Sequence, residues 1–494
     1  MRPNRLLVRG PGWLGLVLIL FLTCGCFRMG PRYSPPVPEP APPRSFQFAP
    51  QTPAAAQESF ALDQWWRSWD DPEIEALVRL TLVRNLDLVT AAARIKAALA
   101  RVEQAGAGLL PALNLEAQGQ TSRSSVAFNR SGLTGQVDRT TESYNLSLAA
   151  AYEVDLWGRI RAGRGAAVAD LLQARENRWT LAQSLVAESV TALLRARALA
   201  RRLDVATRLV EAQVRTLSLV EGRYQRGLTS ILDVRQARRS LARSRSQIPS
   251  LRQELGTTFQ RLAVLTGRYP RVPDLAPLAQ DPTPELSPIP AGLPSDLLRR
   301  RPDIRAAEAA LHAASQRTGQ ARAARFPVIS LTGRLGFSSD ELGELFTDES
   351  NLWSLALGVS APLYDGGLRS AREREAKAAT ESLAAEYALT LLTAFREVET
   401  ALLTEQEQRK RRDHLALALV EAIATQEAAL NRYQRGLADY LRVLEAQQTR
   451  FQVEDDLVLT ELALWTNRVA LHRALGGGWA KPEPAVKAVS GKTP

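Results

Sequence analysis

The sequence predicts an α+β fold made of a tandem repeat, in which each copy combines a pair of β-strands with a long α-helical coiled-coil hairpin. The hexapeptide Arg-Tyr-Gln-Arg-Gly-Leu occurs at residues 223–228 and again at 432–437, a displacement of 432 − 223 = 209 positions. Each copy follows a long stretch rich in Ala, Leu and Arg, and two short segments of alternating hydrophobicity precede that stretch. Aromatic residues make up only 6% of the 494 residues, which is typical of long helices rather than of a compact enzyme core.

The N-terminus has the pattern of an export signal. Several arginines precede an apolar run from Trp13 to Leu22 that is too short to span a membrane, so residues 1–25 are expected to be a signal peptide. The step Gly25-Cys26 resembles a bacterial lipobox and predicts acylation of Cys26; an ordinary signal peptide with an inert Cys26 is the alternative. The proline-rich residues 26–60 are expected to form an extended, lipid-anchored segment.

Four segments alternate apolar and polar residues with a period of two, as strands with one apolar and one polar face do. They are expected at about 112–121 and 143–155 in the first repeat and at about 328–338 and 352–364 in the second. Each is close to the roughly 9 to 11 residues that a tilted strand needs to cross a bilayer. Since the smallest packed barrels need about eight strands, we expect three copies to share a membrane barrel of about twelve. A soluble sandwich edge or two surface hairpins is the alternative.

The helical stretches are too long for a compact domain. No proline interrupts the 227 − 158 = 69 residues from Gly158 to Gly227, which as one helix would extend about 100 Å. Apolar residues recur at the spacing of a coiled coil in both copies: Leu203, Ala206, Val210, Val214 and Leu217 in the first, and Leu391, Phe395, Val398 and Leu402 in the second. Gly227 and Gly436 are expected to end the long helices, with returning helices that begin near Ile231 and Tyr440.

These signals divide the chain into a first repeat at residues 61–270, a linker at 271–294, a second repeat at 295–478 and a disordered tail at 479–494. The first turn of a helix is expected at Pro302, after a short preceding helix.

Composition and charge do not point to catalysis or to nucleic acid. The net charge of +11 comes mostly from arginines spread over helical segments, without a basic block beside aromatic residues. His312, His414 and His472 lie in separate helical segments without the spacing of metal ligands, so we expect no catalytic set, metal or cofactor. Each histidine is expected at a surface or an interface.

Several motifs together resemble the TolC-type outer-membrane efflux proteins, in particular the lipoprotein branch that serves resistance-nodulation-division pumps. The matching motifs lie, in order, at residues 30–33, 65–66, 71–72, 152–159, 293–304 and 362–367 and at both Arg-Tyr-Gln-Arg-Gly-Leu copies. The resemblance implies a homotrimer with a twelve-stranded barrel in the outer membrane, continued by a helical tunnel across the periplasm. It also implies a passive exit duct for small molecules, docked to a periplasmic adaptor and an inner-membrane pump.

The resemblance further implies that the tunnel is closed at rest at its periplasmic tip. The second tip motif places Tyr433, Arg442 and Glu445 in this gate, and Asp233 is equivalent to Arg442 in the first repeat (442 − 209 = 233). Arg442 and Glu445 share a helix face because they are three residues apart. Arg442 is basic where many members of the family are acidic, so it either locks the tip by pairing with an acidic neighbour or alters the pore charge. A plain surface pair is the alternative.

The same resemblance implies that the adaptor docks on the two tips, at Arg226 and Gly227 in the first repeat and at Arg435 and Gly436 in the second. The outer-membrane component of a type I protein secretion system has the same architecture and is the alternative function. A periplasmic adaptor or scaffold would have one helical hairpin between compact β-domains, which the duplicated strand pairs argue against. An enzyme would need a catalytic residue set, and the sequence offers no plausible one.

Overall fold

The computed structural model describes residues 64–123, 140–271 and 297–477, together with 43, 45–48 and 286. The expected signal peptide, Cys26, most of the anchored segment, most of the linker and the tail lie outside the described residues. The chain divides into two compact units, the first with Ile95–Ala174 and Ala307–Tyr387, the second with Arg175–Ala306 and the residues from Ala388 onward. Each unit takes segments from both repeats, so the two compact units are not the two copies of the duplication.

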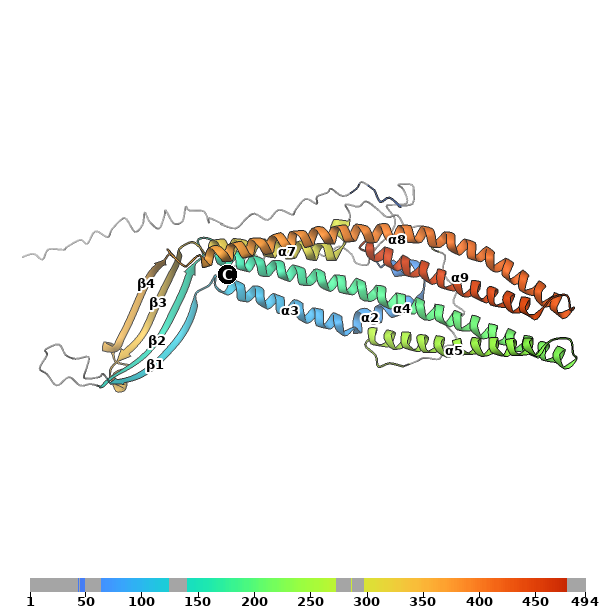
Figure 1. Ribbon diagram of the computed structural model, residues 1–494. Coiled ribbons are helices and arrows are strands. Elements are labelled where there is room, and N and C mark those ends of the chain that lie inside the picture. The colour runs from blue at the N-terminus through green and yellow to red at the C-terminus, as the bar shows by residue number, and fades with distance from the viewer. Residues whose placement is uncertain are drawn as a thin grey trace, which may run out of the picture. The chain divides into compact units, whose positions relative to one another are not determined.

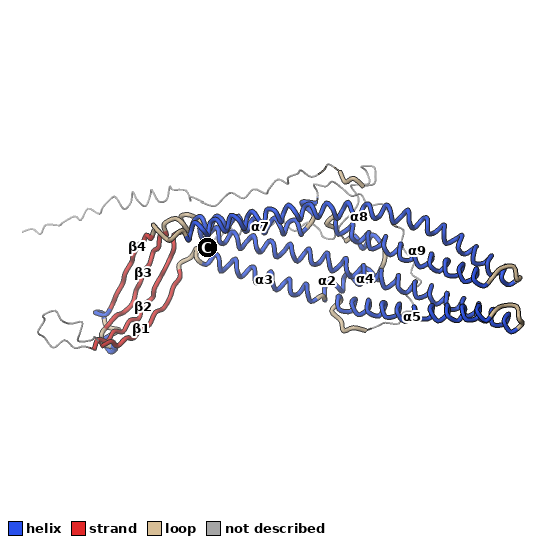
Figure 2. Tube along the Cα trace, viewed as in Figure 1, coloured by secondary structure: helices blue, strands red, loops and turns tan. Residues whose placement is uncertain are grey.

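In the first unit, four antiparallel strands form one sheet in the order β1-β2-β3-β4 (Figures 1 and 2). The strands are β1 (Ala112–Arg123), β2 (Thr140–Val154), β3 (Val328–Ser339) and β4 (Asn351–Ser360). The sequence predicted four strands in two pairs, and the structure has them. β4 ends at Ser360 rather than near residue 364, because Pro362 has no N–H to donate to a ladder. The short 3₁₀-helices η6 (Leu342–Glu344) and η7 (Asp348–Ser350) lie between β3 and β4.

The helices repeat their lengths in the two copies. α4 (Arg159–Gln225) and α8 (Leu368–Gln434) each have 67 residues, and the returning helices α5 (Ile231–Leu265) and α9 (Tyr440–Ala474) each have 35. α3 (Leu86–Ala107) and α7 (Pro302–Ala323) each have 22. The remaining described helices are η2 (Trp65–Trp69), α2 (Pro72–Arg84) and α6 (Leu297–Arg300). Among the described helices, none combines the length and apolarity that a membrane-crossing helix requires.

The strand-to-helix junctions explain two of the sequence motifs. In the first copy, a carboxylate oxygen of Asp155 accepts a hydrogen bond from Ile160 N (3.1 Å), and its second oxygen accepts one from Arg161 N (2.9 Å). In the second copy, Asp365 accepts from Gly367 N (3.1 Å) and Arg369 N (3.2 Å). These aspartates satisfy N–H groups at the start of α4 and α8 that have no partner within the helix. Each long helix therefore begins at a fixed residue after its strand.

In the second unit, α4 packs against two different helices. Leu199 and Ala196 share a buried cluster with Leu251 and Leu255 of α5, and Val205 and Ala212 share another with Phe451 of α9. Because the neighbours lie on different sides, α4 needs two apolar stripes. Val214, one of the residues with coiled-coil spacing, belongs to neither of these two clusters and is 41% exposed within the single chain.

A cluster of tryptophans forms the densest aromatic packing of the second unit. Trp65, Trp66 and Trp69 of η2 pack with Trp465 of α9 in one buried cluster. The ring of His472 stacks on Trp65, with 4.8 Å between the ring centroids. His472 is 1% exposed, and its burial lowers its pKa to about 3. The expectation of a surface or interface position is wrong for this histidine, since Trp65 and Trp69 of η2 pack against its ring.

Candidate functional site

One face of the sheet is a continuous apolar surface. Across the strands, Leu115 lies opposite Leu148, Leu148 opposite Leu335, and Leu335 opposite Trp353. These side chains are exposed to solvent within a single chain, and the exposed fraction is 75% for Leu115 and 79% for Trp353. An exposed apolar surface of this extent marks a site of contact with a membrane or a protein. Alternation of this kind along each strand is typical of strands whose apolar face contacts lipid.

The opposite face of the sheet is polar. It carries Asn, Gln, Ser and Thr side chains from all four strands and a few charged ones, among them Glu116 and Arg334. Sheets whose faces alternate in this way are typical of membrane barrels with an aqueous interior. The sheet therefore has the chemistry of a pore wall, apolar on one side and wettable on the other.

The two helical hairpins end in the same backbone motif. At the first tip, Leu228 N donates to Arg223 O (2.9 Å) and Gly227 N to Tyr224 O (2.9 Å). At the second tip, the matching bonds are Leu437 N to Arg432 O (2.8 Å) and Gly436 N to Tyr433 O (3.0 Å). This pair of bonds defines the Schellman helix ending, which needs a residue at positive φ. Gly227 (φ 71°) and Gly436 (φ 77°) provide it, as the sequence predicted.

The residues predicted to receive an adaptor are accessible at these tips. Arg226 and Arg435 are both exposed beside their glycines. The leucines that follow the glycines, Leu228 and Leu437, are 58% and 64% exposed. Each tip thus presents an arginine and a leucine side by side on a rigid turn.

The structure places the four predicted gate residues in three environments. Asp233 belongs to the capping box of α5, where it accepts from Ser230 N (3.3 Å) and from Thr229 Oγ1 (2.5 Å). Arg442 Nη1 lies 3.3 Å from Glu445 Oε2, and the two side chains are 74% and 64% exposed. The pair predicted from the three-residue spacing forms, but on one helix and in solvent, where an ion pair typically contributes at most about 1 kcal/mol.

Tyr433 instead lies at the centre of the contact between the two tips. It is 2% exposed and shares a buried cluster with Val220 of α4 and with Tyr440 of α9, the two tyrosine rings being 6.0 Å apart. Burial raises the pKa of Tyr433, and raises that of Tyr440 to about 12. Both phenols therefore stay neutral through the physiological range.

Sequence reasoning missed Arg223 as a site residue. Its guanidinium lies 4.8 Å from the centre of the Tyr433 ring, and its Nη1 donates to Gln434 O (3.3 Å). Arg223 is on α4 and both partners are on α8, so this side chain joins the tips of the two hairpins. Arg223 is the first residue of the repeated hexapeptide, so the repeat itself singled out this position. The repeat could not tell the two copies apart, however, and Arg432 at the same position of the second copy is exposed.

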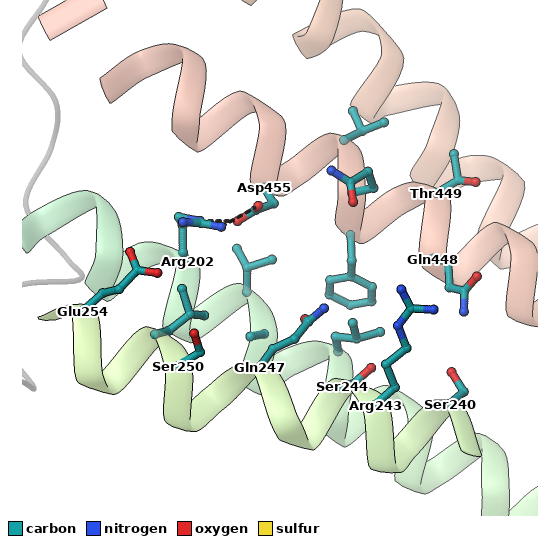
Figure 3. Close-up of a pocket in the computed structure, with 17 residues that line it drawn as sticks. Arg202, Ser240, Arg243, Ser244, Gln247, Ser250, Glu254, Gln448, Thr449 and Asp455 are labelled. Atoms are coloured by element: carbon teal, nitrogen blue, oxygen red, sulfur yellow. Dashed lines mark hydrogen bonds and ion pairs between the residues drawn. The ribbon is translucent and has the colours of Figure 1, made fainter. Parts of the chain in front are cut away.

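Between the two hairpins lies a polar groove of about 610 Å³ (Figure 3). Its walls come from α4, α5 and α9 and carry hydroxyl and amide groups such as Ser244, Gln247 and Gln448. Within the wall of the groove, Arg202 pairs with Asp455, with 2.7 Å between Arg202 Nε and Asp455 Oδ1. The hydrogen bonds to this carboxylate raise the pKa of the Arg202 guanidinium.

No group of three or more His, Cys, Asp or Glu side chains that could hold a metal ion occurs within the described ranges.

Comparison with known proteins agrees with this geometry. The family model described as outer membrane efflux protein matches residues 77–268 and 293–477. The pyoverdine export outer membrane protein OpmQ of Pseudomonas putida is 32% identical over 460 residues, covering 91% of this chain and 95% of that protein. The outer membrane protein OprJ of Pseudomonas aeruginosa is 32% identical over 486 residues, covering 96% and 97%.

Among solved structures, the outer-membrane channel OprN superposes with a TM-score of 0.82 at 31% identity, covering 92% of this chain and 99% of that one. The match extends over both repeats and includes both the sheet and the helical hairpins. The chain therefore belongs to the outer membrane efflux protein family, the outer-membrane exit channels of efflux pumps.

Proposed function

We propose that three copies of this chain form a passive exit duct through the outer membrane, which conducts small molecules delivered by an inner-membrane pump and a periplasmic adaptor. The exposed apolar face of the sheet is the observation that carries the proposal, because a soluble protein would leave this surface in water. With the apolar faces against lipid, the polar faces line an aqueous lumen. Conduction through such a lumen needs no catalysis.

The trimer follows from the edges of the sheet. β1 and β4 are the first and last strands of its order, so within the described part of the chain each has an edge of backbone N–H and C=O groups without a partner strand. In hydrocarbon such groups cost several kcal/mol each, so membrane sheets close on themselves. Three copies, with the β4 edge of one against the β1 edge of the next, give a closed barrel of about twelve strands.

The helical tips are proposed as the docking surface for the adaptor and as the gate. Arg226, Gly227, Arg435 and Gly436 present the accessible turns. For the gate we propose Tyr433 and Asp233 at the joined tips, with Arg442 and Glu445 as an outer charged pair. The relatives named for pyoverdine, toluene and antibiotic export favour small-molecule efflux over type I protein secretion.

An acyl chain on Cys26 is proposed as a second membrane attachment. It is supported by the lipobox-like Gly25-Cys26 step after the apolar run. A lipid chain alone gives only weak membrane binding, so the strands are expected to provide the main anchorage.

The experiment that tests this function uses full-length protein extracted from outer membranes in detergent. We expect the mass of three copies, pores in planar bilayers, and a lipid-modified Cys26 as the mature N-terminus in mass spectrometry. A stable monomer with full β-content would contradict the shared barrel. An unmodified N-terminus would contradict the acylation alone, because the pore does not depend on it.

A further inference from the structure

An ion pair on the polar face of the sheet bridges two strands that are not neighbours. Arg334 on β3 places its Nη2 atom 2.9 Å from Oε2 of Glu116 on β1. β2 lies between these strands in the sheet. The arginine side chain therefore crosses a whole strand to reach its partner.

Small residues beneath the bridge make this crossing possible. Ser147 of β2 lies directly opposite Glu116 on one side and opposite Gly336 on the other. A Cβ atom at Gly336 would lie 2.1 Å from Leu146 O, so no side chain fits there. Ser147 is 4% exposed although it lies on an open sheet face. The small side chain of Ser147 leaves room for the bridge to cross β2.

The bridge sets the charge of the polar face. Among the described strand residues on this face, the charged side chains are Glu116, Arg334 and Glu153. Glu153 is neutralised by Arg159, whose Nη2 atom lies 2.7 Å from its Oε2 atom. Glu116 and Arg334 cancel each other, so that the face as a whole has no net charge.

We propose that the Glu116–Arg334 pair determines the ion selectivity of the duct by holding the net charge of the lumen wall at zero. The inference rests on the proposed function, in which the polar faces of three copies line the lumen. The Glu116 and Arg334 side chains are 49% and 50% exposed, so each charge remains in contact with passing ions. Loss of one partner would leave a ring of three like charges, one in each copy.

The charges act on permeating ions at low ionic strength. The Debye length is about 10 Å at 0.1 M salt and about 3 Å at 1 M. A ring of unpaired charges on the wall therefore attracts its counter-ions strongly at 0.1 M and weakly at 1 M. A neutral wall leaves cations and anions without such a preference, which suits a duct for chemically varied solutes.

The test is the reversal potential of single pores in planar bilayers under a KCl gradient around 0.1 M. We expect Arg334→Gln to shift it toward cation selectivity and Glu116→Gln toward anion selectivity. The double variant Glu116→Gln/Arg334→Gln, which has no charge at either position, is the matched control and should return to the wild-type value. Arg334→Lys, which keeps the charge but loses the fork geometry, should also remain close to wild type. Arg334→Met provides a second neutral variant if glutamine prevents folding.

The outcomes separate the inference from the function on which it rests. A wild-type protein that forms no pore would overturn both. A conducting wild type, with single variants that leave the reversal potential unchanged or shift it in the same direction, would overturn the inference alone. A purely structural role for the bridge would lower the yield of trimer in both single variants without opposite shifts in selectivity.

Discussion

At the scale of single residues, the contact that joins the two helical tips comes from Arg223 rather than from the predicted pair of Arg442 and Glu445. Arg223 reaches from α4 to the ring of Tyr433 and to the carbonyl of Gln434 on α8. Arg442 and Glu445 lie on the same helix. A contact between the two hairpins resists their separation. A contact between two residues of one helix does not, because both residues move together with that helix.

We therefore predict that Arg223→Ala raises the opening frequency of the pore more than Arg442→Ala does. A cation–π contact is worth at least about 0.5–1 kcal/mol, and it would be repeated in each copy of the proposed trimer. Single-channel recording in planar bilayers measures the effect, with Arg432→Ala as the matched control at the equivalent exposed position. Equal opening frequencies for Arg223→Ala and Arg432→Ala would show that the tips are held together by other contacts.

His472 gives a second prediction at this scale, concerning pH. Its pKa is about 3 in the folded protein and about 6.5 in an unfolded chain. The folded state binds fewer protons between these values, so this histidine lowers stability as the pH falls from about 6.5 toward 3. The thermal midpoint should therefore drop less between pH 7 and pH 4 in His472→Gln and His472→Leu than in the wild type.

The exposed His414 is the control for that experiment. His414→Gln should retain the full wild-type drop, because it leaves His472 and the tryptophans packed against it unchanged. If the His472 variants lose as much thermal stability on acidification as the wild type, protonation of carboxylates accounts for the whole effect.

At the scale of elements, the helical tips depend on backbone conformation. Gly227 is at φ 71°, and a Cβ atom there would meet nothing within 4 Å. Any cost of a side chain at this position is consequently conformational rather than steric. For a residue other than glycine, the left-handed region costs roughly 1–2 kcal/mol.

We predict that Gly227→Ala speeds amide hydrogen exchange at the first tip by about tenfold, which corresponds to about 1.4 kcal/mol. Gly222 is the matched control, since it lies within α4 and a Cβ there would also meet nothing within 4 Å. Gly222→Ala should slow exchange slightly, because alanine favours the helix by about 0.5–1 kcal/mol. Unchanged exchange in Gly227→Ala would mean that the turn adopts another ending without cost.

At the scale of the whole molecule, the boundaries of the two repeats do not coincide with the boundaries of the two compact units. Each repeat supplies two strands, a helix of 67 residues and one of 35. Each compact unit combines segments of both repeats. A single repeat would have two strands, too few for a stable sheet, and it would lack the partner hairpin on which Tyr433 and Val220 are buried. The two copies are therefore expected to fold together.

The sequence by itself determined the elements, because their signals are local. Period-two alternation defined the strands and their faces, proline-free stretches defined the long helices, and Gly227 and Gly436 fixed the tips through a conformation that other residues avoid. It also identified the family, since the motifs at the junctions and tips combine capping aspartates with turn glycines.

Only the tertiary structure decided which side chains meet across elements. The duplication makes Arg223 and Arg432 identical in sequence context, yet only the packing of α4 against α8 gives Arg223 a partner ring. His472 is buried because η2, some 400 residues earlier in the chain, covers it with Trp65. Glu116 and Arg334 meet across β2 because the register places only small β2 residues, Ser147 opposite Glu116 and Ala149 opposite Arg334, between them. Contacts of this kind depend on the distances between segments far apart in sequence, which no local pattern of residues encodes.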